Sequence, residues 1–114
     1  MTSYRVERIA EQVKHLVSEL LERRIKDPRL ARVNVTSVKV SPTLREATLF
    51  VSALAGESAR DGVMDGLESA KGFLRREVGR RLQLRNVPEL YFKWDTAIEK
   101  GDHVLSLLDD LKEE

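Results

Sequence analysis

Residues 33–53 read VNVTSVKVSPTLREATLFVSA, and this stretch decides the fold. Its first eight residues are rich in β-branched side chains, and residues 47–53 alternate apolar with polar side chains, so both runs predict strands. Ser41-Pro42-Thr43 between them predicts a short turn, which makes the pair an antiparallel hairpin. The alternation slips between Val35 and Val38, which predicts a bulge in the first strand.

A long amphipathic helix is predicted before the hairpin, over residues 3–24. Ser3 is the expected N-cap, and Lys26-Asp27-Pro28 ends the helix because a residue that precedes proline is disfavoured in helical conformation. The apolar residues that recur at three- and four-residue steps are Val6, Ile9, Val13, Leu16, Val17, Leu20 and Leu21.

After the hairpin, helical periodicity begins near Ser58 or Asp61 and reaches Ala70-Lys71-Gly72. It resumes at Phe73 and continues to about Leu84, so we predict two helices that meet at a kink. Residues 86–88 break the pattern, and residues 89–95 form an aromatic third strand. The order α-β-β-α-α-β predicts a two-layer α+β domain with helices on one face of a three-stranded sheet.

Length and charge set the domain organisation. With 114 residues and no cysteine, the chain fits one domain in residues 1–100, without disulfides or thiolate metal sites, followed by an acidic helix or tail in residues 101–114. The net charge of +1 hides a split: residues 70–86 carry six basic residues and one acidic residue, whereas residues 95–114 carry two and seven. Such asymmetry favours a basic face for a polyanion. No stretch resembles a signal peptide or a membrane span, so we expect a cytoplasmic protein.

The basic segment has the spacing of a phosphate-binding helix. Leu74, Val78 and Leu82 share one face, while Arg76 and Arg80 lie roughly opposite. Nearby glycines would let another backbone come close, and a second helix that began at the kink would offer unpaired N–H groups to a phosphate. A solvated face of arginines is the plainer alternative. The predicted RNA-binding residues are Ala70, Lys71, Gly72, Arg75, Arg76, Arg80, Arg81 and Arg85.

Other chemistry finds little support in the sequence. His15 and His103 lack the neighbours of a metal site, and no phosphate-binding loop or nucleophile–base arrangement is present, so we expect no metal, no cofactor and no catalysis. The aromatic side chains of Tyr91, Phe92 and Trp94 are expected mainly in the core, with Trp94 as the best candidate for an exposed base-stacking ring.

Several motifs together resemble the bacterial ribosome-binding factor A family. The resemblance covers residues 4–99. It is carried by RVERIAEQV at residues 5–13, IKDPR at residues 25–29, the strand at residues 33–40 with the following Ser41-Pro42, ESAKGFLR at residues 68–75, LRNVPELYF at residues 84–92, and Asp95.

The resemblance implies a type II KH-like RNA-binding fold in which Ala70-Lys71-Gly72 replaces the usual Gly-x-x-Gly loop. It also implies binding to 16S rRNA and the free small (30S) ribosomal subunit during late maturation, and we expect the chain to be a monomer. Roles in 5′-end processing and cold adaptation, and release with the help of a GTPase, follow from the same resemblance. The alternative function is a protein-interaction module that docks through the first helix or the acidic tail, and a small hydrolase ranks third.

Overall fold

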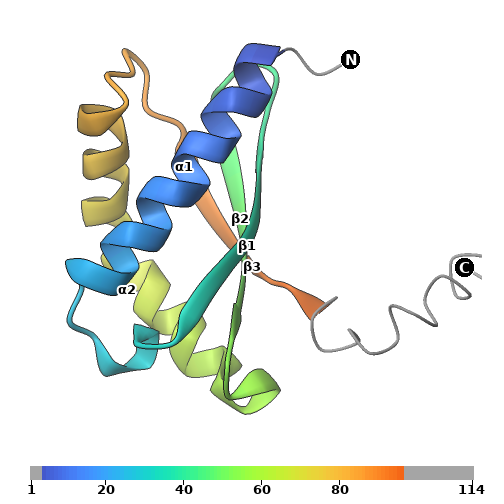
Figure 1. Cartoon of the computed structure of the whole chain (residues 1–114), viewed down its shortest axis with the longest axis vertical. Coiled ribbons are helices and arrows are strands. Elements are labelled where there is room, and N and C mark those ends of the chain that lie inside the picture. Colours follow the sequence, from blue (N-terminus) through green and yellow to red (C-terminus); the bar gives the residue numbers. More distant parts are fainter. Residues whose placement is uncertain (1–3, 97–114) are drawn as a thin grey trace, which may run out of the picture.

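The computed structural model describes residues 4–96, which form two long helices and one sheet (Figure 1). In chain order the elements are α1 (Tyr4–Arg23), the 3₁₀ turn η1 (Pro28–Leu30), β1 (Val33–Val40), β2 (Glu46–Ala53), the 3₁₀ turn η2 (Gly56–Ala59), α2 (Arg60–Arg81) and β3 (Glu89–Trp94). The expected N-cap Ser3 and the predicted C-terminal helix or tail lie outside the described residues. No helix in residues 4–96 is long and apolar enough to cross a membrane.

The sheet has the order β1-β2-β3. β1 and β2 form the predicted antiparallel hairpin, and the register shifts between Val35 and Ser37, which confirms the bulge. β3 runs parallel to β2, so the sheet is mixed. In the hairpin turn the Ser41 hydroxyl accepts hydrogen bonds from the N–H groups of Arg45 and Glu46, both at 3.1 Å. These bonds fix the turn, in which Leu44 adopts a positive φ of 62°.

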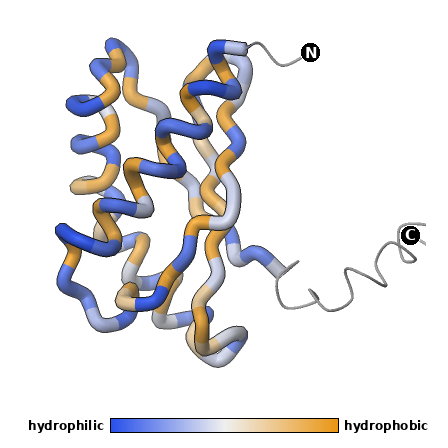
Figure 2. The backbone as a smooth tube through the Cα atoms, viewed as in Figure 1, coloured by the Kyte–Doolittle hydropathy of each residue, from blue (hydrophilic) through white to orange (hydrophobic). Residues whose placement is uncertain are grey.

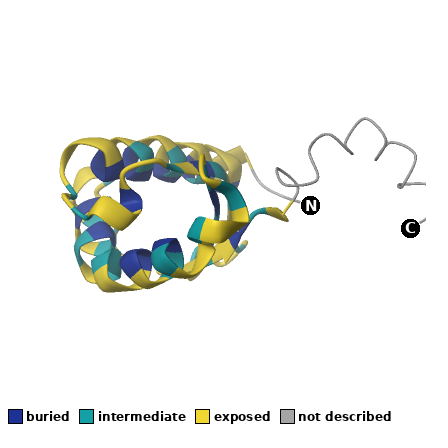
Figure 3. Cartoon of the chain, turned by 90° about the horizontal axis from the view of Figure 1, so that it is seen from below, coloured by how far each residue is buried: buried dark blue, intermediate teal, exposed yellow. Residues whose placement is uncertain are grey.

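One face of the sheet carries the core. Ala47, Leu49 and Val51 alternate along β2 and are fully buried, together with Leu90 on β3. They pack in one cluster with the apolar stripe of α1 and with residues of α2, so both helices lie against this face. Figure 2 shows hydrophobic and hydrophilic residues alternating along the helices and strands, and Figure 3 shows buried residues interspersed with exposed ones along the same elements. The predicted two-layer α+β class is confirmed.

The aromatic strand β3 differs in one detail from the expectation. Trp94, the best candidate for an exposed ring, is 8% exposed and belongs to the core, whereas Tyr91 is 44% exposed. Because side chains alternate along a strand, Trp94 shares the inward face with Leu90, and Tyr91 points to the opposite face.

The predicted break between two helices does not form. α2 is helical without interruption from Arg60 to Arg81, and Figure 1 shows a change of direction in its middle. Residues 70–72 therefore lie inside a bent helix, and no second helix N-terminus offers unpaired N–H groups beside Lys71. A Cβ atom at Gly72 would meet nothing within 4 Å, so the local packing does not exclude a side chain there.

α2 also ends earlier than the predicted Leu84. Gln83 adopts a positive φ of 54°, and its N–H donates to the Arg80 carbonyl at 3.3 Å. The N–H of Leu84 donates to the Gly79 carbonyl at 3.1 Å, which completes a Schellman cap. Gly79 serves the same turn: a Cβ at this position would lie 2.4 Å from Cγ2 of Val87. Gly79 therefore admits this chain's own loop rather than another molecule's backbone.

Candidate RNA-binding surface

The eight predicted RNA-binding residues lie along the second half of α2 and the loop that follows it. Seven of them, from Ala70 to Arg81, are on the helix, and Arg85 is in the connection to β3. All eight thus belong to one segment of the chain, residues 70–85. Their side chains, however, have different partners, and these partners decide which positive charges remain available to a ligand.

Arg75 holds the loop before β3 in place. Its Nη2 donates to the Val87 carbonyl at 2.9 Å, and its Nε donates to the Pro88 carbonyl at 3.1 Å. The Glu89 carboxylate lies 3.7 Å from the same Nε. Because the guanidinium satisfies two carbonyls that no strand partner reaches, Arg75 is mainly a structural residue that shapes the surface.

Lys71 is also engaged. Its Nζ lies 3.1 Å from a carboxylate oxygen of Glu68, one turn earlier on α2. The same ammonium lies 5.7 Å from the centre of the Tyr91 ring, within the range of a cation–π contact. Lys71 therefore bridges α2 and the exposed ring of β3 instead of marking the start of a helix.

Arg80 and Arg81 share one carboxylate. Oε1 of Glu77 accepts a hydrogen bond from Nη2 of Arg80 at 2.7 Å and one from Nε of Arg81 at 3.2 Å. The hydrogen bond from Arg80 is the main cause that holds the pKa of Glu77 below its usual range, and it outweighs the opposing effect of burial. Glu77 therefore stays ionised at neutral pH and offsets part of the positive charge of this segment.

Arg76 contacts the same aromatic ring as Arg24, a residue that the sequence did not single out as functional. Its guanidinium carbon lies 5.6 Å from the centre of the Phe73 ring, and that of Arg24, just after α1, lies 5.7 Å from the same centre. Neither arginine has a carboxylate within ion-pair distance among residues 4–96. We call these three residues the Phe73 cluster. From the sequence, a basic residue at the end of α1 is expected only to interact with the helix dipole, and no spacing rule links it to Phe73.

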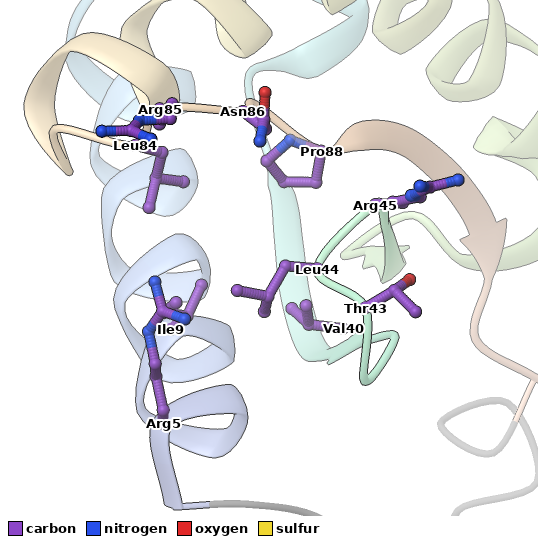
Figure 4. A pocket seen from close by; sticks show the side chains of 10 residues that line it. All are labelled: Arg5, Ile9, Val40, Thr43, Leu44, Arg45, Leu84, Arg85, Asn86 and Pro88. Carbon is purple, nitrogen blue, oxygen red and sulfur yellow. The ribbon is translucent and has the colours of Figure 1, made fainter.

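Arg85 is exposed and lies at a second feature, a cavity of about 700 Å³ between the N-terminal half of α1, the hairpin turn and the loop before β3 (Figure 4). Two further arginines, Arg5 and Arg45, line it. Arg85 is thus at the edge of the α2 surface and belongs equally to this cavity.

No group of three or more histidine and acidic residues that could hold an ion occurs within residues 4–96. His15 lies 3.4 Å from Glu11 on the exposed side of α1, and His103 is outside the described residues.

The comparisons with known proteins agree with one another. The family model described as "Ribosome-binding factor A" matches residues 5–108. A ribosome-binding factor A of Natranaerobius thermophilus is 45% identical over 95% of this chain and 82% of its own length. One from Synechococcus is 49% identical over 96% of this chain and 84% of its own length.

Solved structures extend the match to three dimensions. A putative ribosome-binding factor A from Thermotoga maritima superposes with a TM-score of 0.71 at 30% identity, covering 82% of this chain and 89% of the other. The Thermus thermophilus factor gives a TM-score of 0.70 at 26% identity, covering 78% and 93%. A homology model of the latter factor, fitted into a cryo-EM map of a complex between the 30S subunit and ribosome-binding factor A, gives a TM-score of 0.67 at 26% identity, covering 80% and 96%. Sequence, motifs and fold agree, and this chain belongs to the ribosome-binding factor A family.

Proposed function

We propose that this chain is a non-catalytic assembly factor that binds the small ribosomal subunit and its 16S rRNA during late maturation, acting as a cytoplasmic monomer. Family membership and the 30S complex of the Thermus thermophilus relative support subunit binding. In this proposal the chain assists 5′-end processing of the rRNA, matters most in the cold, and leaves the mature subunit with the help of a GTPase.

The observation that carries the site assignment is the Phe73 cluster. Two guanidiniums lie over one ring, and neither has a carboxylate partner in the described part of the chain. Both guanidiniums carry a positive charge, so a phosphate that approached this ring would be attracted by both. Arginine suits this role because its planar fork of donors matches phosphate oxygens.

In this proposal the other predicted RNA-binding residues contribute to RNA binding in different ways. Arg80, Arg81 and Arg85 extend the positive surface along the end of α2, and the Glu77 carboxylate fixes the first two in place. Lys71 and Tyr91 present a charge and an exposed ring at the edge of β3. Gly72 leaves open space on the same half of the helix, where an RNA backbone could approach closely.

The test is the double substitution Arg24→Gln/Arg76→Gln. It removes two charges without placing an acid beside Glu77, so the fold should be retained. We expect co-sedimentation with 30S subunits and affinity for 16S rRNA to fall by at least about tenfold. The slope of log affinity against log salt should become shallower by roughly 0.7–0.9 for each phosphate group that the variant no longer neutralises.

The matched control is Arg32→Gln/Lys39→Gln, which removes the same charge from exposed positions beside and on β1. It should leave binding close to that of the wild type. Equal losses in both variants would show that only net charge matters, and unchanged binding of Arg24→Gln/Arg76→Gln would refute the assignment. Binding that ignores both salt and these arginines would instead favour the protein-interaction alternative.

A further inference from the structure

The cavity at the end of the domain has an apolar floor. The charged and polar residues at its rim are Arg5, Thr43, Arg45, Arg85 and Asn86. Its apolar side chains come from four parts of the chain and are Ile9, Val40, Leu44, Leu84 and Pro88. A cavity of about 700 Å³ is within the usual size range of small-ligand sites. Figure 4 shows the side chains of Leu44 and Leu84 directed into the space between α1 and the hairpin turn.

The backbone is strained at both sides of this floor. Leu44 has a φ of 62°, and Gln83, directly before Leu84, has a φ of 54°. A left-handed conformation is costly for residues other than glycine, and the cost is usually tolerated where the surrounding structure has a use for it. At Leu44 the turn places an apolar side chain on the floor of this cavity.

The rim is positively charged and has no internal counter-charge. Among residues 4–96, no carboxylate lies within ion-pair distance of Arg5, Arg45 or Arg85. In Figure 4 the guanidinium of Arg5 lies along α1 toward the cavity, whereas those of Arg45 and Arg85 point outward in opposite directions. The positive charges therefore lie at the mouth and on both sides of it, not at the floor.

Asn86 supplies a neutral polar group beside this floor. Its amide offers both donors and an acceptor, which is the combination that can pair with the edge of a nucleobase. An acidic ligand without a flat apolar part would leave the floor unused. A free nucleotide would not bring phosphates to both outward-pointing arginines, but a nucleotide within a strand would.

We propose that this cavity holds one unstacked nucleotide of a single-stranded RNA segment, with its base on the Leu44–Leu84 floor and the phosphates on either side near Arg45 and Arg85. The inference rests on the proposed RNA-binding function and adds a second binding site to it, separate from the Phe73 cluster. Such a site would let the protein distinguish unpaired from helical RNA, since a base inside a duplex cannot enter the cavity.

The experiment compares two labelled five-nucleotide RNAs, one with adenine and one with an abasic residue at the centre, by fluorescence anisotropy with the full chain. Wild type should bind the adenine RNA about tenfold more tightly than the abasic RNA, a ratio that corresponds to about 1.4 kcal/mol of binding free energy. Leu44→Asn should bring this ratio close to one, because asparagine tolerates the left-handed backbone but removes the apolar surface. Asn86→Ala should also reduce the ratio, and its exposed position leaves the fold intact.

Leu54→Asn is the matched control, because Leu54 is 75% exposed and lies outside this cavity. It should keep the wild-type ratio, and so should Arg24→Gln/Arg76→Gln, because the Phe73 cluster lies outside this cavity. If wild type binds the two RNAs with equal affinity, the inference is overturned while the proposed function stands. If wild type binds neither RNA, the inference is likewise overturned, and co-sedimentation with 30S subunits decides the proposed function separately.

Discussion

Glu77 and Arg80 lie one turn apart on α2, and the Glu77 carboxylate accepts a 2.7 Å hydrogen bond from the Arg80 guanidinium. Glu77 is the single acidic residue between positions 70 and 86, and it is only 7% exposed. A buried carboxylate thus sits beneath the basic surface and holds both Arg80 and Arg81 against the helix. The surface is consequently less positive, and more ordered, than its composition suggests.

Replacing the Glu77 carboxylate by an amide should distinguish two effects on RNA binding: the negative charge of Glu77 and the way it holds Arg80 and Arg81 in position. Glu77→Gln keeps the size of the side chain, removes one negative charge and leaves Arg80 and Arg81 without an ionic partner. We expect affinity for 16S rRNA to increase by about two- to fivefold, comparable to the value of one exposed ion pair. Thermal unfolding should occur at a lower temperature. A loss of affinity in a folded variant would contradict this expectation and would show that Glu77 positions the arginines for binding.

The free energy of unfolding should fall in acid because two carboxylates have lowered pKa values. Hydrogen bonds from Arg80 lower the pKa of Glu77, and those from the Arg29 side chain lower the pKa of Asp27. A carboxylate with a lowered pKa contributes stability above its unfolded-state pKa of about 4, and this contribution is lost as the pH falls through its folded-state pKa.

Denaturant unfolding at pH values from 7 to 3 measures this effect. The double variant Glu77→Gln/Asp27→Asn should start less stable at pH 7 and lose less stability on acidification than wild type. Glu19→Gln, which removes a carboxylate from the exposed side of α1, is the control for the general effect of charge. An identical slope in wild type and in the double variant would show that other groups dominate the acid transition.

The glycines of α2 should respond in opposite directions to alanine. Gly72→Ala adds a Cβ in open space within a continuous helix, so the free energy of unfolding should rise by up to about 1 kcal/mol. Gly79→Ala would bring Cβ to 2.4 Å from Val87 and should cost roughly 1–3 kcal/mol. Chemical denaturation compares the two variants. A destabilised Gly72→Ala would indicate that the bend in α2 requires glycine.

The same Gly72→Ala variant also probes the RNA surface. If an RNA backbone approaches this position closely, the added methyl group should weaken rRNA binding even though it stabilises the protein. Stronger folding together with weaker binding is therefore the expected combination. Unchanged affinity would place the RNA away from Gly72 and confine the surface to the Phe73 cluster and the end of α2.

The helix cap at Gln83 should be open to improvement. Gln83 occupies the left-handed position of a Schellman cap, where glycine has no Cβ penalty. Gln83→Gly should raise the free energy of unfolding by about 1 kcal/mol, since the relief of strain exceeds the added entropy of the unfolded chain. Gln12→Gly, in the middle of α1, is the matched control and should lower it by a similar amount.

Features that depend on short-range patterns were predictable from the sequence. The hairpin with its bulge, the extent of α1 and the third strand all follow from periodicities within a few residues, because burial repeats every two residues in a strand and every three to four in a helix. The motifs were also sufficient to indicate the family. The predicted break at residues 70–72 was wrong, because a glycine weakens a helix without ending it when packing on either side is sound.

The sequence by itself therefore determined the α+β class, the order of the three strands, the buried stripes and the basic segment. Only the tertiary structure decided which arginines remain available: Arg75 is committed to the carbonyls of Val87 and Pro88, and Arg24 joins Arg76 over Phe73. The physical reason is that these two kinds of feature depend on different parts of the chain: the first on neighbouring residues, the second on distant ones. Periodicity reports which side of an element is buried, whereas hydrogen bonds and ion pairs form only within about 3–4 Å and depend on how distant segments are brought together.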